Sequence, residues 1–256
     1  MPTSPHTFVW YELMTTDMDA AEAFYGAVVG WSPQNIPQPG MRYTVMKAGD
    51  KMVAGVMTLP PEARDAGARP GWVGYVGTDD VDASTRKVRE AGGMVHREPA
   101  DIPDIGRFSV VADPQGAMFM LFQPMGGDNS PAPAGTPGHI GWHELYAADW
   151  PSALDFYAGQ FGWTKAHAVD MGPMGTYQLF AAGGDPTGGM MNKPDAIPMP
   201  VWLYYFVVEE IDAAAVRVTA GGGQVLNGPH QVPGGGWILH AMDPQGAMFA
   251  LTAPRR

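Results

Sequence analysis

The chain has 256 residues, of which 45% are hydrophobic, 16% charged and 11% aromatic, so it can bury a sizeable core and is not intrinsically disordered. At about 150 residues per domain, the length predicts two ordinary domains or one large one. The net charge of −11 and the scattered Lys and Arg residues exclude the basic stripe that nucleic acids require and disfavour anionic membranes. Cysteine is absent, which excludes disulfides, thiolate nucleophiles and Cys-based metal sites.

The N-terminal residues lack the basic and apolar segments of a signal peptide. No apolar run approaches the roughly 18 residues of a membrane span. We therefore expect a soluble, cytoplasmic protein.

The first predicted elements are a strand and a helix. Aromatic and β-branched residues over 8–14 predict a strand in which Trp10 and Glu12 share one face. Asp17 is a candidate N-cap, and Gly30 stands where a helix C-cap is expected. The helix between them has a buried stripe with i, i+3, i+4, i+7 spacing, formed by Ala21, Phe24, Tyr25 and Val28.

The elements that follow are mainly strands. Residues 41–59 predict two or three short strands, broken at Gly49-Asp50 and at Gly55. A strand over 72–76 and a helix over 81–91 come next, and further strands end near Phe122. Residues 8–59 and residues 72–122 are thus each predicted to form a strand, a helix and further strands, a βαβββ unit.

The chain is an internal duplication. Trp10–Asp17 returns as Trp142–Asp149, an offset of 132 residues (142 − 10), and Asp113–Phe119 returns unchanged as Asp243–Phe249. The segment between the copies is rich in Pro, Gly, Ser and Ala, as exposed linkers are. We expect a first domain over 1–124, a linker over 125–137 and a second domain over 138–256.

Three paired motifs carry a resemblance to a known family. They are Asp-x6-Phe-Tyr (from Asp17 and from Asp149), Gly-Trp (at Gly30 and at Gly162) and Asp-Pro-Gln-Gly (from Asp113 and from Asp243). Together they resemble the vicinal oxygen chelate superfamily, which includes glyoxalase I, bleomycin-resistance proteins and extradiol dioxygenases. The resemblance implies an α+β fold of two tandem domains, each a cupped, partly open mixed β-barrel of two βαβββ units with the helices outside. In the family the concave face holds a metal and a small substrate.

The family's metal ligands do not carry over to this sequence. At the positions where His, Gln or Glu ligands are expected stand Trp10, Trp142, Val73, Leu203, Met120 and Ala250, and the segments 54–56 and 188–190. A divalent ion needs three or four oxygen or nitrogen donors, which these side chains do not supply. We therefore expect neither the family's metal centre nor another cofactor.

An atypical metal site in the second domain is an alternative. That copy holds His139, His143, His230 and His240, whereas the first copy has Tyr11 and Val110 at the positions of His143 and His240. Strand parity places His143 on the face opposite Glu144. Isolated histidines in folded proteins usually satisfy ordinary hydrogen bonds.

Two carboxylates are the candidate catalytic residues. Glu12 and Glu144 stand between apolar neighbours, two residues past the family's first metal position. A carboxylate in an apolar cup either becomes a usable acid or base or accepts hydrogen bonds from the protein. Both readings stay open, because duplication also copies a structural residue into both halves.

Aromatic residues recur at matching places and are candidates for binding an apolar or planar substrate. These candidates are Trp10, Trp142, Trp72, Trp202, Tyr75 and Tyr205, together with Met120. Core filling is the structural alternative for the aromatic residues, and gap filling is the alternative for methionine.

These residues support two classes of function. The first is an enzyme, a metal-independent lyase, isomerase or hydroxylase-like catalyst that uses Glu12 or Glu144. The second is a non-catalytic binder that sequesters a small apolar or planar compound, as bleomycin-resistance proteins do. In both cases the expected partner is a small molecule and the protein is a monomer or homodimer.

Overall fold

The structure is a computed structural model that describes residues 6–38, 40–126 and 132–256. Part of the expected linker, 127–131, lies outside the described residues. Within the described ranges, no helix has the length and apolar character needed to cross a membrane.

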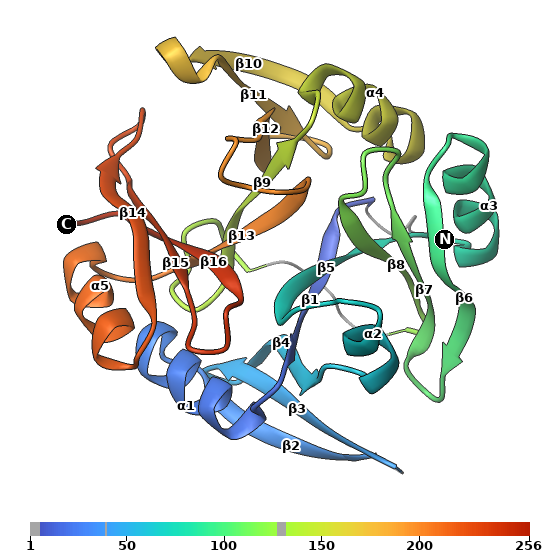
Figure 1. Cartoon of the computed structure of the whole chain (residues 1–256), viewed down its shortest axis with the longest axis horizontal. Helices are drawn as coiled ribbons and strands as arrows, with labels where there is room; N and C mark the ends of the chain where they lie inside the picture. Colours follow the sequence, from blue (N-terminus) through green and yellow to red (C-terminus); the bar gives the residue numbers. More distant parts are fainter. Residues whose placement is uncertain (1–5, 39, 127–131) are drawn as a thin grey trace. The chain divides into compact units, whose positions relative to one another are not determined.

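The described residues form four βαβββ units, as the sequence predicts (Figure 1). In the first repeat they are β1 (Phe8–Thr15), α1 (Met18–Val29), β2 (Ser32–Gln38), β3 (Met41–Ala48) and β4 (Lys51–Thr58), then β5 (Gly71–Gly77), α3 (Val81–Glu90), β6 (Met94–Ile102), β7 (Gly106–Ala112) and β8 (Met118–Pro124). In the second they are β9 (Ile140–Ala147), α4 (Trp150–Phe161), β10 (Thr164–Asp170), β11 (Thr176–Ala181) and β12 (Gly188–Asn192), then β13 (Val201–Val207), α5 (Ile211–Ala220), β14 (Gln224–Gln231), β15 (Trp237–Met242) and β16 (Met248–Ala253). The short helices α2 (Pro61–Asp65) and η1 (Gly172–Met174) lie in connections.

Each repeat contributes one open, eight-stranded mixed sheet, in agreement with the predicted α+β fold of two tandem domains. The strand orders within its four-stranded halves are β2-β3-β4-β1 and β5-β8-β7-β6 in the first repeat, and β10-β11-β12-β9 and β13-β16-β15-β14 in the second. In every half the first strand pairs in parallel with the last strand of its unit, and the other pairs are antiparallel. The first strands are therefore central and carry the residues that the sequence selects.

The predicted helix ends are confirmed. Asp17 caps α1 by accepting a hydrogen bond from the amide of Ala20 over 3.0 Å, and Asp149 caps α4 in the same way. Gly30 and Gly162 end these helices in the left-handed conformation. The predicted apolar stripe of α1 is buried, and so is its counterpart on α4.

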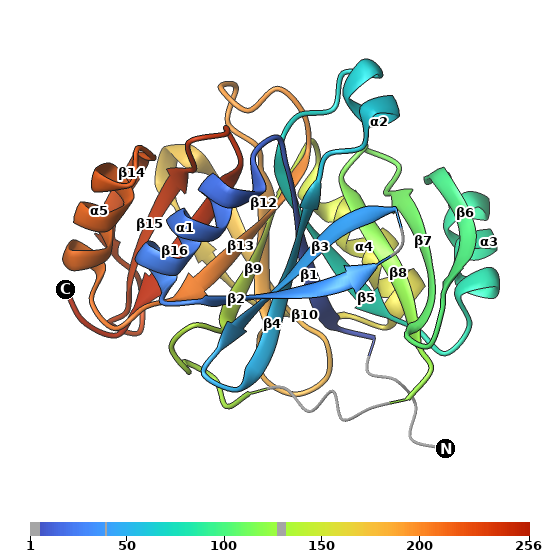
Figure 2. The ribbon, with the colours of Figure 1, turned by 90° about the horizontal axis from the view of Figure 1, so that it is seen from below.

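The chain packs as two compact units, and each unit takes elements from both repeats. The middle unit comprises the described parts of 1–9, 74–131 and 143–202, and the terminal unit comprises those of 10–73, 132–142 and 203–256. In the terminal unit, helices α1 and α5 lie side by side (Figures 1 and 2). In the middle unit, α3 contacts α4.

A buried tyrosine joins the two repeats inside each unit. In the terminal unit the hydroxyl of Tyr25 donates to the carboxylate of Asp243 over 3.1 Å and accepts from the indole of Trp72 over 2.8 Å. The middle unit repeats this arrangement with Tyr157, Asp113 and Trp202, at 3.2 and 2.9 Å. Burial raises the pKa of both aspartates, and backbone amide donors oppose that shift.

The Gly-Trp motifs have a similar role. The indole of Trp31 donates to the carbonyl of Gly138 over 2.6 Å, and the indole of Trp163 donates to the carbonyl of His6 over 2.6 Å. In both cases the tryptophan of one repeat holds the backbone that precedes the first strand of the other. Residues of the motifs that carry the family resemblance thus join the two repeats within each unit.

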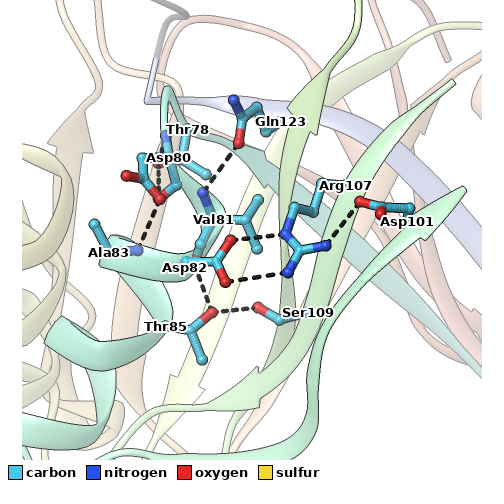
Figure 3. Close-up of polar contacts among 10 residues, drawn as sticks. All are labelled: Thr78, Asp80, Val81, Asp82, Ala83, Thr85, Asp101, Arg107, Ser109 and Gln123. Carbon is cyan, nitrogen blue, oxygen red and sulfur yellow. Dashed lines mark hydrogen bonds and ion pairs between the residues drawn. The ribbon is translucent and has the colours of Figure 1, made fainter.

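Helix α3 shows how a helix is fixed to its sheet (Figure 3). Asp80 caps it by accepting from the amide of Ala83 over 2.8 Å. On β7, Arg107 donates to Asp82 of the helix and to Asp101 of β6, both over 2.7 Å. Beneath them the hydroxyls of Thr85 and Ser109 form a buried hydrogen bond of 2.8 Å. These polar groups are all paired, so they hold α3 in place and do not form a site.

Candidate functional site

The two candidate carboxylates are buried. Glu12 lies on β1 and Glu144 on β9, and each side chain is 5% exposed. Tyr11 and Leu13, the neighbours of Glu12, are buried in the opposite face of β1, because successive side chains of a strand alternate. A buried carboxylate requires hydrogen-bond donors, and the neighbouring strands supply them.

In the first repeat, Tyr43 of β3 donates to Glu12. The phenol oxygen of Tyr43 also accepts from the indole of Trp10 over 3.2 Å. The three side chains form a relay in which the indole donates to the phenol and the phenol donates to the carboxylate. One of the predicted binding residues, Trp10, is therefore connected to one of the predicted catalytic residues.

A glycine makes room for this phenol. Gly55 of β4 stands beside Glu12 in the parallel register. A Cβ atom on Gly55 would lie 2.0 Å from the Tyr43 hydroxyl, so any larger residue would displace the ring. The expected strand break at Gly55 is therefore wrong, since Gly55 lies inside β4 and its missing side chain is replaced by the tyrosine ring.

The second repeat has the same arrangement. Tyr177 of β11 donates to Glu144 over 2.9 Å. Gly189 of β12 stands beside Glu144, and a Cβ atom there would lie 2.3 Å from the ring of Tyr177. A second phenol, that of Tyr146 on β9, also donates to Glu144.

The phenols stay protonated at neutral pH. Burial, followed by the negative charge of Glu12, raises the pKa of Tyr43, and burial followed by Glu144 raises the pKa of Tyr146. Both groups are thus hydrogen-bond donors to a carboxylate, which can only accept when it is ionised. Tyr43 and Tyr177 are half-buried, so the tyrosines form the outer part of each pair and the glutamates the inner part.

The other predicted binding residues lie in different surroundings. Trp72 and Trp202 are buried in the aromatic cores, where they donate to Tyr25 and Tyr157. Tyr75 pairs with Met120 across β5 and β8, and both are buried. Tyr205 is buried and its hydroxyl lies 2.8 Å from His240 Nε2, while Trp142 on β9 is half-buried. The structure thus brings Trp10 to Glu12 and Tyr75 to Met120.

The residues at the family's metal positions do not fit a metal. Met120 and Ala250 are buried apolar side chains, and so are Val73 and Leu203. The described residues contain no group of three or more His, Asp or Glu side chains that could hold an ion. Thioether and aliphatic groups do not ligate the hard or borderline divalent ions, so we derive no chemical step through a metal.

The histidines of the second repeat have protein partners. His143 Nδ1 donates to the carbonyl of Thr187 over 2.8 Å, and its ring stacks on Phe8 at 4.6 Å. Burial lowers the pKa of His143 to about 4, so its ring is neutral at physiological pH. His230 Nε2 lies 2.8 Å from Asn227 Oδ1, and His240 contacts Tyr205. These contacts agree with ordinary hydrogen-bonded histidines.

Sequence reasoning missed the tyrosines Tyr43 and Tyr177. A signal for them exists, because Tyr-x11-Gly recurs in both repeats (55 − 43 = 12 and 189 − 177 = 12). Its meaning depends on the strand pairing that places each tyrosine over its glycine, and a linear pattern does not give that pairing.

Comparison with known proteins agrees with this fold. The family model of the glyoxalase/bleomycin resistance protein/dioxygenase superfamily matches residues 7–121 and again residues 137–251. The chain belongs to this superfamily. Each of its two repeats is one family domain.

Relatives that match almost the whole length of the chain include a protein named as a glyoxylase and a protein named for anthracycline biosynthesis. "Putative glyoxylase CFP32" of Mycobacterium tuberculosis is 35% identical over 247 residues, which cover 96% of this chain and 94% of the relative. "Anthracycline biosynthesis protein DnrV" of Streptomyces peucetius is 33% identical over 268 residues, which cover 98% and 94%.

Solved structures of the superfamily share the fold. A Mn(II)-bound glyoxalase from Novosphingobium aromaticivorans superposes with a TM-score of 0.70 at 18% identity, covering 98% of this chain and 83% of the other. The 2,3-dioxygenase LapB from Pseudomonas sp. KL28 gives a TM-score of 0.66 at 14% identity, covering 97% and 93%. At these identities the likeness concerns the fold alone.

Proposed function

We propose that the protein binds a small planar or apolar organic molecule, with Glu12 and Glu144 as polar contacts, and that it does so without the metal centre of metal-dependent relatives. The observation that carries this proposal is the buried carboxylate–phenol pair, which occurs once in each repeat with the same glycine beneath the phenol. In a predominantly apolar strand face, such a pair supplies the few polar groups that orient a ligand.

Two further observations support a planar ligand. Trp10 presents a half-buried indole next to the first pair, and a large aromatic surface suits a planar partner. One relative is named for anthracycline biosynthesis, and anthracyclines are polycyclic aromatic compounds.

A binding titration tests this proposal. The probe is 2,6-dihydroxyanthraquinone, whose separated hydroxyl groups do not chelate a metal ion, titrated by calorimetry into protein that has been treated with EDTA and dialysed. We expect saturable binding that added Mn²⁺ or Zn²⁺ does not strengthen. The variants Glu12→Gln and Glu144→Gln should each weaken binding at one site by about tenfold, because a hydrogen bond to a charged group contributes about 1.5–3 kcal/mol.

Two results would overturn the proposal. One is the absence of saturable binding, and the other is binding that appears only when a divalent metal is added. Gln245→Ala, which changes a residue outside both carboxylate pairs, is a control that should leave the affinity unchanged.

Metal-independent catalysis by the same residues is a second candidate function. It is favoured by the distance of 2.9 Å between a proton donor, the Tyr177 hydroxyl, and a proton acceptor, the Glu144 carboxylate. The carboxylate would take a proton from a carbon next to a carbonyl and become a neutral acid, which would release the phenol hydrogen to donate to the resulting enolate oxygen. We expect the protein to accelerate the exchange of this carbon-bound hydrogen for deuterium from the solvent, and we expect Glu144→Gln to abolish the acceleration. Exchange at the uncatalysed rate in the unmodified protein would exclude this second function.

A further inference from the structure

The two carboxylate pairs differ at one position. Two residues after each glutamate, on the same strand face, the first repeat has Met14 and the second has Tyr146. Met14 is half-buried and stands opposite Met57 in the parallel pairing of β1 with β4. Tyr146 is buried and stands opposite Met191 in the pairing of β9 with β12.

The side chains at this position have different chemistry. In the second repeat the phenols of Tyr146 and Tyr177 both donate to Glu144, so their single hydrogens are committed to the carboxylate. A phenol whose hydrogen is committed can meet any further polar group only as a hydrogen-bond acceptor. The cluster of Glu144, Tyr146 and Tyr177 therefore presents mainly hydrogen-bond acceptors.

The first repeat offers a different surface at the same place. Met14 and Met57 are thioethers, which accept hydrogen bonds weakly and adapt their shape to apolar partners. Next to Glu12, Met14 thus replaces a polar phenol with a flexible apolar side chain, whereas Met57 has its counterpart in Met191.

We infer that positions 14 and 146 determine ligand specificity, so that the second repeat selects planar molecules that carry hydroxyl donors and the first repeat selects less polar planar molecules. This inference rests on the proposed binding function and assigns a ligand class to each repeat. The protein then holds two different small-molecule sites.

A pair of probes that differ only in polarity tests the inference. They are 2,6-dihydroxynaphthalene and 2,6-dimethylnaphthalene, which have the same planar ring and substituents of similar size. Binding is measured by probe fluorescence with the full chain, using Glu12→Gln to weaken the first site and Glu144→Gln to weaken the second.

The expected result is a change in selectivity. Tyr146→Met should weaken binding of the dihydroxy probe at the second site by about tenfold, which corresponds to about 1.4 kcal/mol, and leave the dimethyl probe within about twofold. Tyr146→Phe retains the ring and removes the hydroxyl, so it should behave like Tyr146→Met. Met14→Tyr should strengthen binding of the dihydroxy probe at the first site.

Other results would contradict the inference in distinguishable ways. If Tyr146→Met and Tyr146→Phe weaken both probes equally, or neither probe, Tyr146 is a packing residue and the inference fails, whereas the proposed function stands. If neither probe binds the unmodified protein, both the proposed function and the inference fail.

Discussion

The hydroxyl of Tyr25 in the first repeat donates a hydrogen bond to the carboxylate of Asp243 in the second repeat, over 3.1 Å. The same residues in the opposite order, Tyr157 of the second repeat and Asp113 of the first, are joined over 3.2 Å. All four residues are buried, so each repeat supplies half of both contacts.

Removing either tyrosine hydroxyl should destabilise the protein. Tyr25→Phe leaves a buried carboxylate oxygen of Asp243 and the indole of Trp72 without their shared partner, at a cost of about 1–3 kcal/mol. Tyr157→Phe should cost a similar amount in the other unit. Urea unfolding measures both, and a free energy of unfolding unchanged within about 0.5 kcal/mol would show that these hydrogen bonds contribute little.

The two repeats should not fold independently. A fragment of residues 1–131 contains Tyr25 and Asp113 but lacks Asp243 and Tyr157. We expect neither this fragment nor 132–256 alone to give a monomer with a cooperative thermal transition, and we expect the two to copurify when coexpressed. A monomeric fragment that unfolds cooperatively would show that the contacts within one repeat suffice.

Gly55→Ala should disrupt the first carboxylate pair. The added methyl group would lie 2.0 Å from the Tyr43 hydroxyl, so the ring must move and Glu12 loses its donor. We expect a destabilisation of about 1–3 kcal/mol, in the range of overpacked sites, measured by thermal unfolding.

Gly159→Ala is the matched control for that substitution. Gly159 lies in α4, and a Cβ atom there would meet no neighbour within 4 Å. Since alanine favours helix over glycine by up to about 1 kcal/mol, the control should be neutral or stabilising. Equal losses in the two variants would contradict the role of Gly55.

The stability of the protein should fall in mild acid because of His143. Its pKa is about 4 in the folded protein, below the value of an unfolded chain near 6.5, so the unfolded state binds the proton more readily. The contribution of neutral His143 to the free energy of unfolding is fully present above about pH 6.5. It decreases as the pH falls towards 4, by roughly 1–2 kcal/mol between pH 7.5 and pH 5. His143→Phe should reduce this pH dependence, whereas His230→Gln, at an exposed site, should retain it.

Divalent metals should not stabilise the protein. A ligand that binds only the folded state raises the free energy of unfolding by about 2.7 kcal/mol at one hundred times its dissociation constant, so a site of micromolar affinity is easily detected. With buried apolar side chains at four of the family's metal positions (Val73, Leu203, Met120 and Ala250), we expect the melting temperature to be the same in EDTA and in 0.1 mM (about one hundred times such a constant) Mn²⁺ or Zn²⁺. A rise of several degrees with either ion would identify a metal site.

Much of the fold follows from local patterns in the sequence. The caps at Asp17 and Gly30 and the apolar stripe of α1 fix a helix without help from distant residues, and the repeated motifs reveal the duplication. β2 escaped prediction because Ser32–Gln38 contains two prolines and exposed polar residues and owes its strand conformation to pairing with β3.

The candidate site is less predictable. Glu12 and Glu144 stand out as carboxylates among apolar neighbours, but their partners come from strands that pair with them in space. The motifs are also silent on which tyrosine meets which aspartate, because both repeats carry the same Tyr and the same Asp. Only the three-dimensional packing shows that Tyr25 meets Asp243 and not Asp113.

Each compact unit contains one βαβββ unit from each repeat, and this arrangement limits how the two copies can diverge. A change in the core of α1 must suit residues of the second repeat, and a change in α4 must suit residues of the first, so neither copy can alter its interior alone. Met14 and Tyr146, by contrast, stand at matching positions of β1 and β9 and already differ between the two repeats. A duplicated protein assembled in this way can keep the two interiors to which both repeats contribute and still evolve a separate ligand preference at each site.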